Sequence, residues 1–243
     1  GFFLELDEFV RVHHLGGRVR DGANGISGVS VQATNATTSA TVTTDVNGRY
    51  LFTTLQAGDY VVVLVSGATN FSPASHSVML NTATTNLDFV RIYSLSGRVT
   101  EGTNPVPGVF VTLSNASLTI GASTDANGAY VFSALEAGQY VVHAPTNGLA
   151  YTPLVITNVL PPAVTNADFT GAPVMLGAAA VGGGLALEAL GVPGHTYVFQ
   201  SASMRTNGVW IPFSTNVAGP DGRVRAVHVP SNGPALFYRV GRP

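Results

Sequence analysis

Two residue types are missing from this sequence altogether: it contains no cysteine and no lysine. The absence of cysteine excludes disulfide bonds, thiolate metal ligands and cysteine nucleophiles. The absence of lysine excludes a phosphate-binding G-x-x-x-x-G-K-[ST] loop, because that motif depends on its lysine. All 11 basic residues are arginines.

Charge and long apolar runs are also scarce. Only 10% of the 243 residues are charged, and the formal net charge is −2. A chain with so few charges and a small negative net charge has no basic surface for nucleic acid, so no nucleic-acid partner is expected. A membrane-spanning helix needs about 20 strongly apolar residues. The Gly/Ala-rich stretch at 172–187 is shorter than that and ends at Glu188, so no membrane span is expected.

What the sequence does contain points to an all-β protein. Short runs rich in Val, Thr, Tyr and Phe alternate with clusters of Gly, Asn, Pro and Asp, the pattern of strands and turns. No long stretch has apolar residues at helical spacing. Hydrophobic residues make up 45% of the chain, which distinguishes it from disordered sequences.

An internal repeat spans most of the chain, and every anchor recurs 80 positions later without a gap. Repeats of this kind indicate copies of one structural unit. The anchor pairs are Gly17-Arg18-Val19 with Gly97-Arg98-Val99, Gly28-Val29 with Gly108-Val109, Ala57-Gly58 with Ala137-Gly138, and Asp88-Phe89 with Asp168-Phe169.

Each repeat contains a T-D-x-N-G stretch that predicts a tight hairpin turn. Asn-Gly tolerates the positive φ angles that such turns require. Strand-like residues flank the turn on both sides, as in Tyr50-Leu51-Phe52. The residues expected to form the two turns are Asp45, Asn47 and Gly48 in the first repeat, and Asp125, Asn127 and Gly128 in the second.

Four stretches of the second repeat carry a family resemblance: S-G-R-V-T at 96–100, P-G-V-F-V-T-L at 107–113, T-D-A-N-G-A-Y-V-F at 124–132 and L-E-A-G-Q-Y-V-V at 135–142. They resemble carboxypeptidase-regulatory-like and collagen-adhesin B-type repeats. The resemblance covers about residues 14–171 and implies a transthyretin-like β-sandwich. In that family such modules serve as stalks, spacers, pilus subunits, adhesins or appendages on enzymes. Some adhesin relatives form a Lys–Asn or Lys–Asp isopeptide bond, which a chain without lysine cannot make.

The C-terminal third has no repeat but keeps the β pattern. Its strand-like runs and turns are spaced as in another β-sandwich, and it resembles the last module of large secreted bacterial proteins. The expected fold is therefore all-β, with three tandem antiparallel β-sandwiches of Ig-like or transthyretin-like type behind an N-terminal strand. The expected divisions are an N-terminal strand at 1–13, sandwiches at 14–93 and 94–171, and a C-terminal sandwich at 172–243.

No catalytic constellation is visible, so the protein is not expected to be an enzyme or to hold a cofactor. There is no G-x-S-x-G elbow and no H-E-x-x-H motif, and the six histidines are dispersed. His13 and His14 are adjacent in a strand-like run, so their side chains point to opposite faces and do not share a metal. The single tryptophan, Trp210, is expected in the core.

Two modifications of this picture remain open. Calcium needs six to eight oxygen ligands. The turns at Asp45 and Asp125 offer only a carboxylate and an amide each, so a structural turn is favoured over a calcium site. Three sequons of glycosylation type are also present, at Asn35, Asn70 and Asn115, and they matter only if the source cell uses that pathway.

The N-terminus repeats the end of a sandwich without the sandwich itself. Phe9-Val10-Arg11-Val12 matches Phe89-Val90-Arg91-Ile92 at the same offset of 80. Leu4, Leu6, Val10 and Val12 would lie on one face of such a strand, with Phe3 and Phe9 on the other. An isolated strand of this kind tends to associate with other chains in water, because its backbone N–H and C=O groups are unpaired.

Two interpretations of this N-terminal segment stay open. In the first, the chain comes from a longer array, or the segment folds back on its own domain. In the second, the segment is a donor strand that completes a sandwich of another copy. The expected acceptor is then the C-terminal sandwich of the neighbouring subunit, with Gly16-Gly17 as the hinge.

The leading functional hypothesis is a structural extracellular or cell-surface protein, a subunit of a filament or stalk whose partners are other copies of itself. One alternative is a module that binds glycans or a cell surface. That function would need exposed aromatic side chains, whereas Tyr50, Tyr60, Tyr130 and Tyr140 are expected in the cores. A second alternative is a non-catalytic tail of a secreted enzyme.

Overall fold

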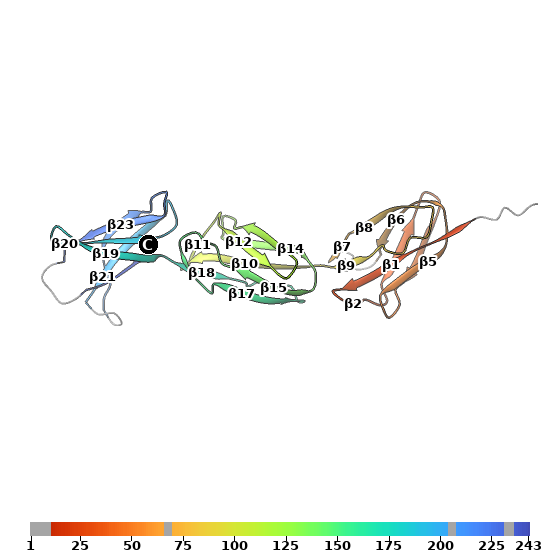
Figure 1. The fold of residues 1–243 in the computed structure, drawn as a ribbon, viewed down its shortest axis with the longest axis horizontal. Helices are drawn as coiled ribbons and strands as arrows, with labels where there is room; N and C mark the ends of the chain where they lie inside the picture. The colour runs from red at the N-terminus through yellow and green to blue at the C-terminus, as the bar shows by residue number, and fades with distance from the viewer. Residues whose placement is uncertain (1–10, 66–69, 204–207, 231–235) are drawn as a thin grey trace, which may run out of the picture. The chain divides into compact units, whose positions relative to one another are not determined.

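The computed structural model describes residues 11–65, 70–203, 208–230 and 236–243, and these residues form strands and no α-helix. The prediction of an all-β fold is confirmed (Figure 1). Within the described ranges, no helix has the length and hydropathy needed to cross a membrane.

The chain falls into two compact units. The first comprises the residues up to Ser94 together with Ser133–Gly138 and Val159–Ala163. The second comprises Leu95–Phe132, Gln139–Asn158 and Val164–Pro243.

The first repeat forms two facing sheets. One has five strands in the order β2-β1-β9-β7, with β5 also paired to β1, and the other has four strands in the order β4-β3-β6-β8. The strands of the first sheet are β1 Val12–Asp21, β2 Asn24–Gly25, β5 Arg49–Gln56, β7 Phe71–Ser72 and β9 Phe89–Arg91. Those of the second sheet are β3 Ser30–Thr34, β4 Ser39–Thr43, β6 Gly58–Leu64 and β8 Ser75–Leu80.

The second repeat has the same pair of sheets, as the 80-residue offset predicts. Its five-stranded sheet has the order β11-β10-β18-β16 with β14 also paired to β10, and its four-stranded sheet has the order β13-β12-β15-β17. The strands are β10 Tyr93–Glu101, β11 Asn104–Pro105, β12 Phe110–Ser114, β13 Thr119–Ser123, β14 Ala129–Leu135, β15 Gly138–His143, β16 Ala150–Thr152, β17 Val155–Leu160 and β18 Phe169–Ala172.

The C-terminal third has fewer strands in its sheets. One sheet has the order β19-β20-β23 and the other the order β22-β21-β24. The strands are β19 Val174–Val181, β20 Gly184–Leu190, β21 Thr196–Ala202, β22 Ile211–Val217, β23 Arg223–His228 and β24 Phe237–Gly241. The buried cluster between them includes Leu187, Tyr197 and Phe199.

The cores follow from alternation along the strands, because successive side chains of a strand point to opposite faces. In β5, Tyr50, Phe52 and Leu55 are buried while most of their neighbours are exposed. The four tyrosines assigned to the cores from the sequence are buried, namely Tyr50, Tyr60, Tyr130 and Tyr140. Trp210 is only partly buried, under the guanidinium of Arg239 at 4.4 Å from its ring centre, so its placement in the core was wrong.

The start of the first sandwich also differs from expectation. Strand β1 already begins at Val12, so the division expected after residue 13 falls inside a strand. The predicted hinge at Gly16-Gly17 lies inside β1 as well, where the two glycines pair with Leu51 and Tyr50 of β5. The hinge prediction is therefore wrong, because both glycines are held in a ladder of hydrogen-bonded strands.

Candidate functional site

Each repeat is closed by a strand that runs parallel to its own first strand. In the first sandwich β9 pairs in parallel with β1, with Phe89 opposite Val19, and in antiparallel fashion with β7. The chain ahead of β9 already follows β1, because the N–H of Gly16 donates to the carbonyl of Thr84 at 2.8 Å and the N–H of Leu87 donates to the carbonyl of Gly16 at 3.1 Å. We call residues 84–91 the closing segment of the first sandwich.

Two adjacent side chains anchor this closing segment. The carboxylate of Asp88 accepts a hydrogen bond from the backbone N–H of Arg18 in β1, at 2.8 Å. The ring of Phe89 is fully buried in the core. The hydroxyl of Tyr50 donates to the carbonyl of Leu87, and burial is the main cause that raises the pKa of this hydroxyl. An acid followed by an aromatic residue therefore fixes the segment to the first strand and to the core at once.

The second sandwich repeats these contacts residue by residue. The N–H of Ser96 in β10 donates to the carbonyl of Val164 at 2.8 Å, and β18 pairs in parallel with β10. The carboxylate of Asp168 accepts from the N–H of Arg98 at 2.8 Å, and Phe169 is fully buried. We call residues 164–172 the closing segment of the second sandwich.

The repeated glycines Gly17 and Gly97 allow the closing segments to approach the first strands. A Cβ added to Gly17 would collide with the carbonyl group of Leu87, and one added to Gly97 would collide with that of Ala167. These glycines are needed for close packing of two backbones.

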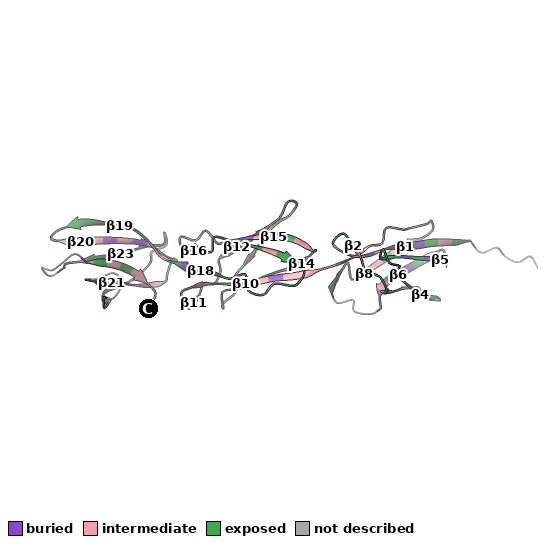
Figure 2. Cartoon of the chain, turned by 90° about the horizontal axis from the view of Figure 1, so that it is seen from below, coloured by how far each residue is buried: buried purple, intermediate pink, exposed green. Residues whose placement is uncertain are grey.

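The C-terminal sandwich has a first strand, β19, but no strand beside its other edge among the described residues. β19 follows the closing segment of the second sandwich directly, as β10 follows β9. It pairs with β20 on one side, from Val181 opposite Gly184 to Val174 opposite Leu190, and forms the edge of its sheet. Almost all of its residues are exposed, including Leu176 and Val181 (Figure 2).

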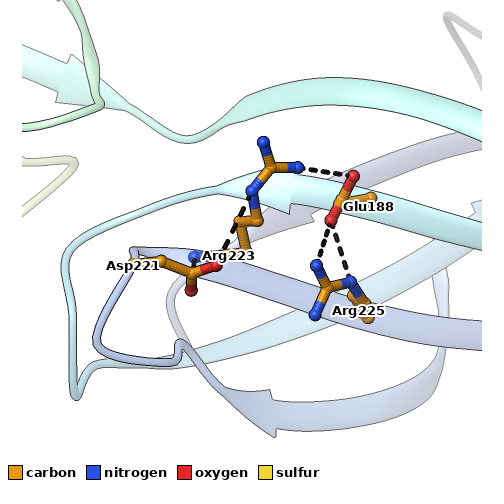
Figure 3. A network of polar contacts seen from close by, with 4 residues as sticks. All are labelled: Glu188, Asp221, Arg223 and Arg225. Atoms are coloured by element: carbon orange, nitrogen blue, oxygen red, sulfur yellow. Dashed lines mark hydrogen bonds and ion pairs between the residues drawn. The ribbon is translucent and has the colours of Figure 1, made fainter.

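A hollow of about 680 Å³ adjoins β19 and continues over the neighbouring strands. Residues 176–179 of β19, Leu187 of β20, Ala226 of β23 and Ser214 of β22 contribute to its lining. The sheet also carries a charge network, in which Glu188 binds Arg223 at 2.8 Å and Arg225 at 2.7 Å (Figure 3). The hydrogen bond from Arg223 is the main cause that lowers the pKa of Glu188. These charges satisfy one another, whereas the free edge of β19 has no partner among the described residues.

The T-D-x-N-G residues lie in the turns between β4 and β5 and between β13 and β14. The carboxylate of Asp45 accepts the N–H groups of Asn47 and Arg49, both at 2.8 Å, and Asp125 does the same for Asn127 and Ala129. Gly48 and Gly128 have φ angles of 74° and 71°, a conformation that glycine adopts without strain. These contacts account for both aspartates through the turn itself.

The glycosylation-type sequons occupy loops. The side chains of Asn35 and Asn115 each accept the backbone N–H groups two and three residues ahead, at 2.7–3.0 Å, and so form the turns after β3 and β12. Asn70 is exposed just before β7, and its carbonyl accepts the N–H of Ile92 at 2.8 Å. No group of three or more His, Asp or Glu side chains in the described ranges is arranged to hold a metal ion.

Five of the predicted donor-strand residues, Phe3, Leu4, Leu6, Phe9 and Val10, lie outside the described residues. The sixth, Val12, is the first residue of β1, where it pairs with Gln56 and is half exposed. The donor strand itself thus stays a prediction.

Glu101, the last residue of β10, has a buried carboxylate that sequence reasoning did not identify. Its side chain is only 3% exposed. Its Oε2 accepts a hydrogen bond from the hydroxyl of Tyr197 at 3.2 Å and lies 3.9 Å from the guanidinium of Arg242. Burial is the main cause that raises the pKa of Glu101, and the contacts with Tyr197 and Arg242 oppose it. A lone Glu at a strand end, far in sequence from both partners, has no motif that could have revealed this contact.

The chain is similar to several proteins over part of its length. Its alignment with Chitinase ChiA of Flavobacterium johnsoniae has 32% identity over 106 residues and covers 41% of this chain and 7% of that protein. Its alignment with Serine-aspartate repeat-containing protein F of Staphylococcus epidermidis has 32% identity over 166 residues and covers 55% of this chain and 10% of that protein. The chain thus spans a tenth or less of the length of these relatives.

Solved structures give weaker likenesses. The match to the Bacillus anthracis TIE protein covers 89% of this chain and 43% of that protein's chain, at 14% identity and a TM-score of 0.35. The match to the full-length major pilin SpaD of Corynebacterium diphtheriae covers 88% of this chain and 80% of that protein's chain, at 10% identity and a TM-score of 0.30.

Sequence models of two domain families match the two repeats. The SdrD B-like domain matches residues 15–88, and the carboxypeptidase regulatory-like domain matches residues 94–171. These matches confirm the resemblance drawn from the repeat motifs. Residues 15–88 are therefore similar to an SdrD B-like domain, and residues 94–171 are similar to a carboxypeptidase regulatory-like domain.

Proposed function

We propose that this protein is a structural extracellular component, a subunit of a surface filament or stalk that assembles head-to-tail by β-strand donation. One observation carries the proposal: the N-terminal segment repeats a closing segment ahead of a sandwich that already has one. Phe9-Val10-Arg11 precedes β1 as Phe89-Val90-Arg91 precedes β10. Since β9 already closes the first sandwich, that sandwich does not need the N-terminal copy.

Strand donation gives the surplus segment a stable environment. Ordering a residue costs about 1–2 kcal/mol of backbone entropy, which a free strand in water does not recover. A strand that joins a sheet edge gains main-chain hydrogen bonds, and burial of its apolar side chains adds about 1.5–3 kcal/mol for each large one. The alternating Leu4, Leu6, Val10 and Val12 are residues that gain from such burial.

The mode of contact determines the form of the assembly. A donor at the N-terminus and an acceptor near the C-terminus are different surfaces of one chain. Contacts between different surfaces are heterologous, and when the rotation does not close they generate open filaments rather than dimers. A head-to-tail fibre is the expected product.

The interior of the repeats favours a structural role over glycan recognition. Tyr50, Tyr60, Tyr130 and Tyr140, which could otherwise stack on sugars, are at most 4% exposed. Two of these rings support the closing strands instead, since Tyr50 packs against Phe89 and Tyr130 packs against Phe169.

Removal of residues 1–10 tests the proposal. The truncated chain keeps all of β1, so both repeats are expected to fold, but filaments seen by negative-stain electron microscopy are expected to be lost. Light scattering should then report monomers. Filaments that persist unchanged after the truncation would refute strand donation.

A matched control removes apolar surface elsewhere. Val46 is 85% exposed in a hairpin turn, so Val46→Ser lowers surface hydrophobicity without touching either end of the proposed contact. The Val46→Ser chain should polymerise as the unchanged protein does. If it also loses its filaments, non-specific hydrophobic association explains them better than strand donation.

A second candidate function is a non-catalytic module of a larger secreted enzyme, and the 32% identity to Chitinase ChiA favours it. The two candidates differ in what the isolated chain does. A module that serves only as a spacer should remain monomeric at every concentration.

A further inference from the structure

We propose that the free edge of β19 is the acceptor for the N-terminal segment of a second copy, which lies beside it as the missing closing strand and runs parallel to it. This inference rests on the proposed head-to-tail assembly and names the surface at which it occurs. It assigns the occupant as residues 4–11 of another chain.

The first argument is the place of β19 in the repeated topology. β1 and β10 are the first strands of their sandwiches, and each has antiparallel neighbours on one side and a parallel closing segment on the other. β19 also follows a closing segment and pairs with an antiparallel neighbour, β20. Within the described residues its second side is free, which is the position that β9 and β18 take in the repeats.

The second argument is the match between the surplus strand and the vacant position. Asp88-Phe89 and Asp168-Phe169 anchor the two closing segments, and the residues 80 positions before Asp88-Phe89 are Glu8-Phe9. The carboxylate of Glu8 can accept a backbone N–H of β19 as Asp88 accepts that of Arg18. The ring of Phe9 can enter the sandwich as Phe89 enters the first core.

The third argument is the backbone of β19 itself. The two-residue loop Gly182-Gly183 joins Val181 of β19 to Gly184 of β20. In a hairpin with a two-residue loop, the residues on either side of the loop form a hydrogen-bonded pair, so Val181 and Gly184 form the last such pair of this hairpin. Hydrogen-bonded and non-hydrogen-bonded pairs alternate along an antiparallel ladder. The N–H and C=O groups of Ala178 and Ala180 therefore point to the free edge, spaced two residues apart as an added strand requires.

The exposed surface of β19 fits the same conclusion. Long apolar edge strands promote association, and native proteins usually cover them or place charges on them. β19 carries no charged residue, and Leu176 and Val181 are 44% and 42% exposed. An added strand would cover this edge and extend a three-stranded sheet toward the size of those in the repeats.

Disulfide cross-linking tests the contact, because the natural chain has no cysteine to interfere. Val10→Cys would be combined in turn with Ala178→Cys, Ala179→Cys and Ala180→Cys. Neighbouring strands bring Cα atoms within the 4.4–6.8 Å that a disulfide needs. Mild oxidation of filaments should give a ladder of covalent multimers from at least one pair, and Val10→Cys with Arg239→Cys, on the edge strand β24, should give none.

The outcomes separate this inference from the proposed function. Filaments that form but give no multimers with any β19 cysteine would place the acceptor elsewhere and overturn the inference alone. A disulfide confined to monomers would mean that the segment folds back on its own chain, which contradicts both. Failure of the unchanged protein to polymerise would refute the proposed function.

Blocking the edge provides a second test. Ala178→Pro removes an N–H that points outward, so it should prevent polymerisation, while Ala178→Val keeps the N–H and should allow it. Mixing the Ala178→Pro chain, which retains its donor, with the chain lacking residues 1–10, which retains its acceptor, should give 1:1 dimers. Such dimers would also show that the proline variant is folded. Normal filaments from Ala178→Pro would overturn the inference.

Discussion

At the scale of the residue, glycine controls how closely a closing segment can approach its first strand. Gly17 and Gly97 face the carbonyl groups of Leu87 and Ala167, and neither position has room for a Cβ. The neighbouring Asp88 and Asp168 then reach the N–H groups of the first strands at 2.8 Å. Close backbone contact and side-chain anchoring therefore depend on one another.

Gly97→Ala should loosen the second closing segment. The added methyl group collides with backbone, which cannot move aside as a flexible side chain could, and overpacking of this kind costs about 1–3 kcal/mol. Hydrogen–deuterium exchange of the intact chain should show faster exchange over residues 164–172. Gly177→Ala is the matched control, because a Cβ there meets nothing within 4 Å. Equal exchange in the two variants would contradict this account.

Residue types alone predicted some of these roles and misled about others. The turn residues were predictable because Asp, Asn and Gly have local reasons to occupy a hairpin, as the contacts of Asp45 show. Glycine also permits flexibility, which favours a hinge at Gly16-Gly17, and only tertiary contacts such as the pairing of these residues with β5 distinguish the two uses. Trp210, predicted in the core, is instead only partly buried and lies under the guanidinium of Arg239.

At the scale of the element, the sequence predicted where strands occur better than how they pair. The alternation and turn signals indicated that the C-terminal third is built of strands, because those signals are local. The parallel pairing of β1 with β9 and of β10 with β18 was not foreseen, since partners 70 residues apart leave no local signal of direction. The free edge of β19 among the described residues can be recognised as the position of a closing strand only by comparison with these pairings.

The end of β10 should give the second unit an unusual pH dependence. Burial raises the pKa of Glu101 in the folded state above its unfolded value, so the folded chain binds the proton more tightly. The stabilising contribution of this group is complete below the unfolded pKa, near 4.3, and is lost as the pH rises through the folded pKa. Glu101 therefore favours folding at acidic pH, opposite to a typical salt-bridged carboxylate.

Glu101→Gln tests this dependence, because glutamine keeps an oxygen that can accept the hydrogen bond from Tyr197. In guanidinium titrations between pH 4 and 8, the variant should be more stable than the unchanged chain near neutral pH. The difference should shrink toward pH 4. Val46→Ser, which changes an exposed side chain that does not titrate, should show no such trend. A Glu101→Gln chain that is destabilised at neutral pH would show that the ionised carboxylate is needed.

At the scale of the whole molecule, the chain is a series in which every first strand follows a closing segment. β10 follows β9, β19 follows β18, and β1 follows residues that repeat the same closing sequence. The N-terminal closing sequence is not used by the first sandwich, which β9 closes, and the first strand of the last sandwich has a free edge among the described residues. Joining the end of one copy to the beginning of the next completes both.

A cryo-electron microscopy map of filaments assembled from the full chain tests this claim most directly. The account predicts a strand parallel to β19 that carries the ring of Phe9 into the C-terminal sandwich and continues into β1 of the next subunit. A map in which the edge of β19 is empty, or in which residues 4–11 pair within their own subunit, would contradict it.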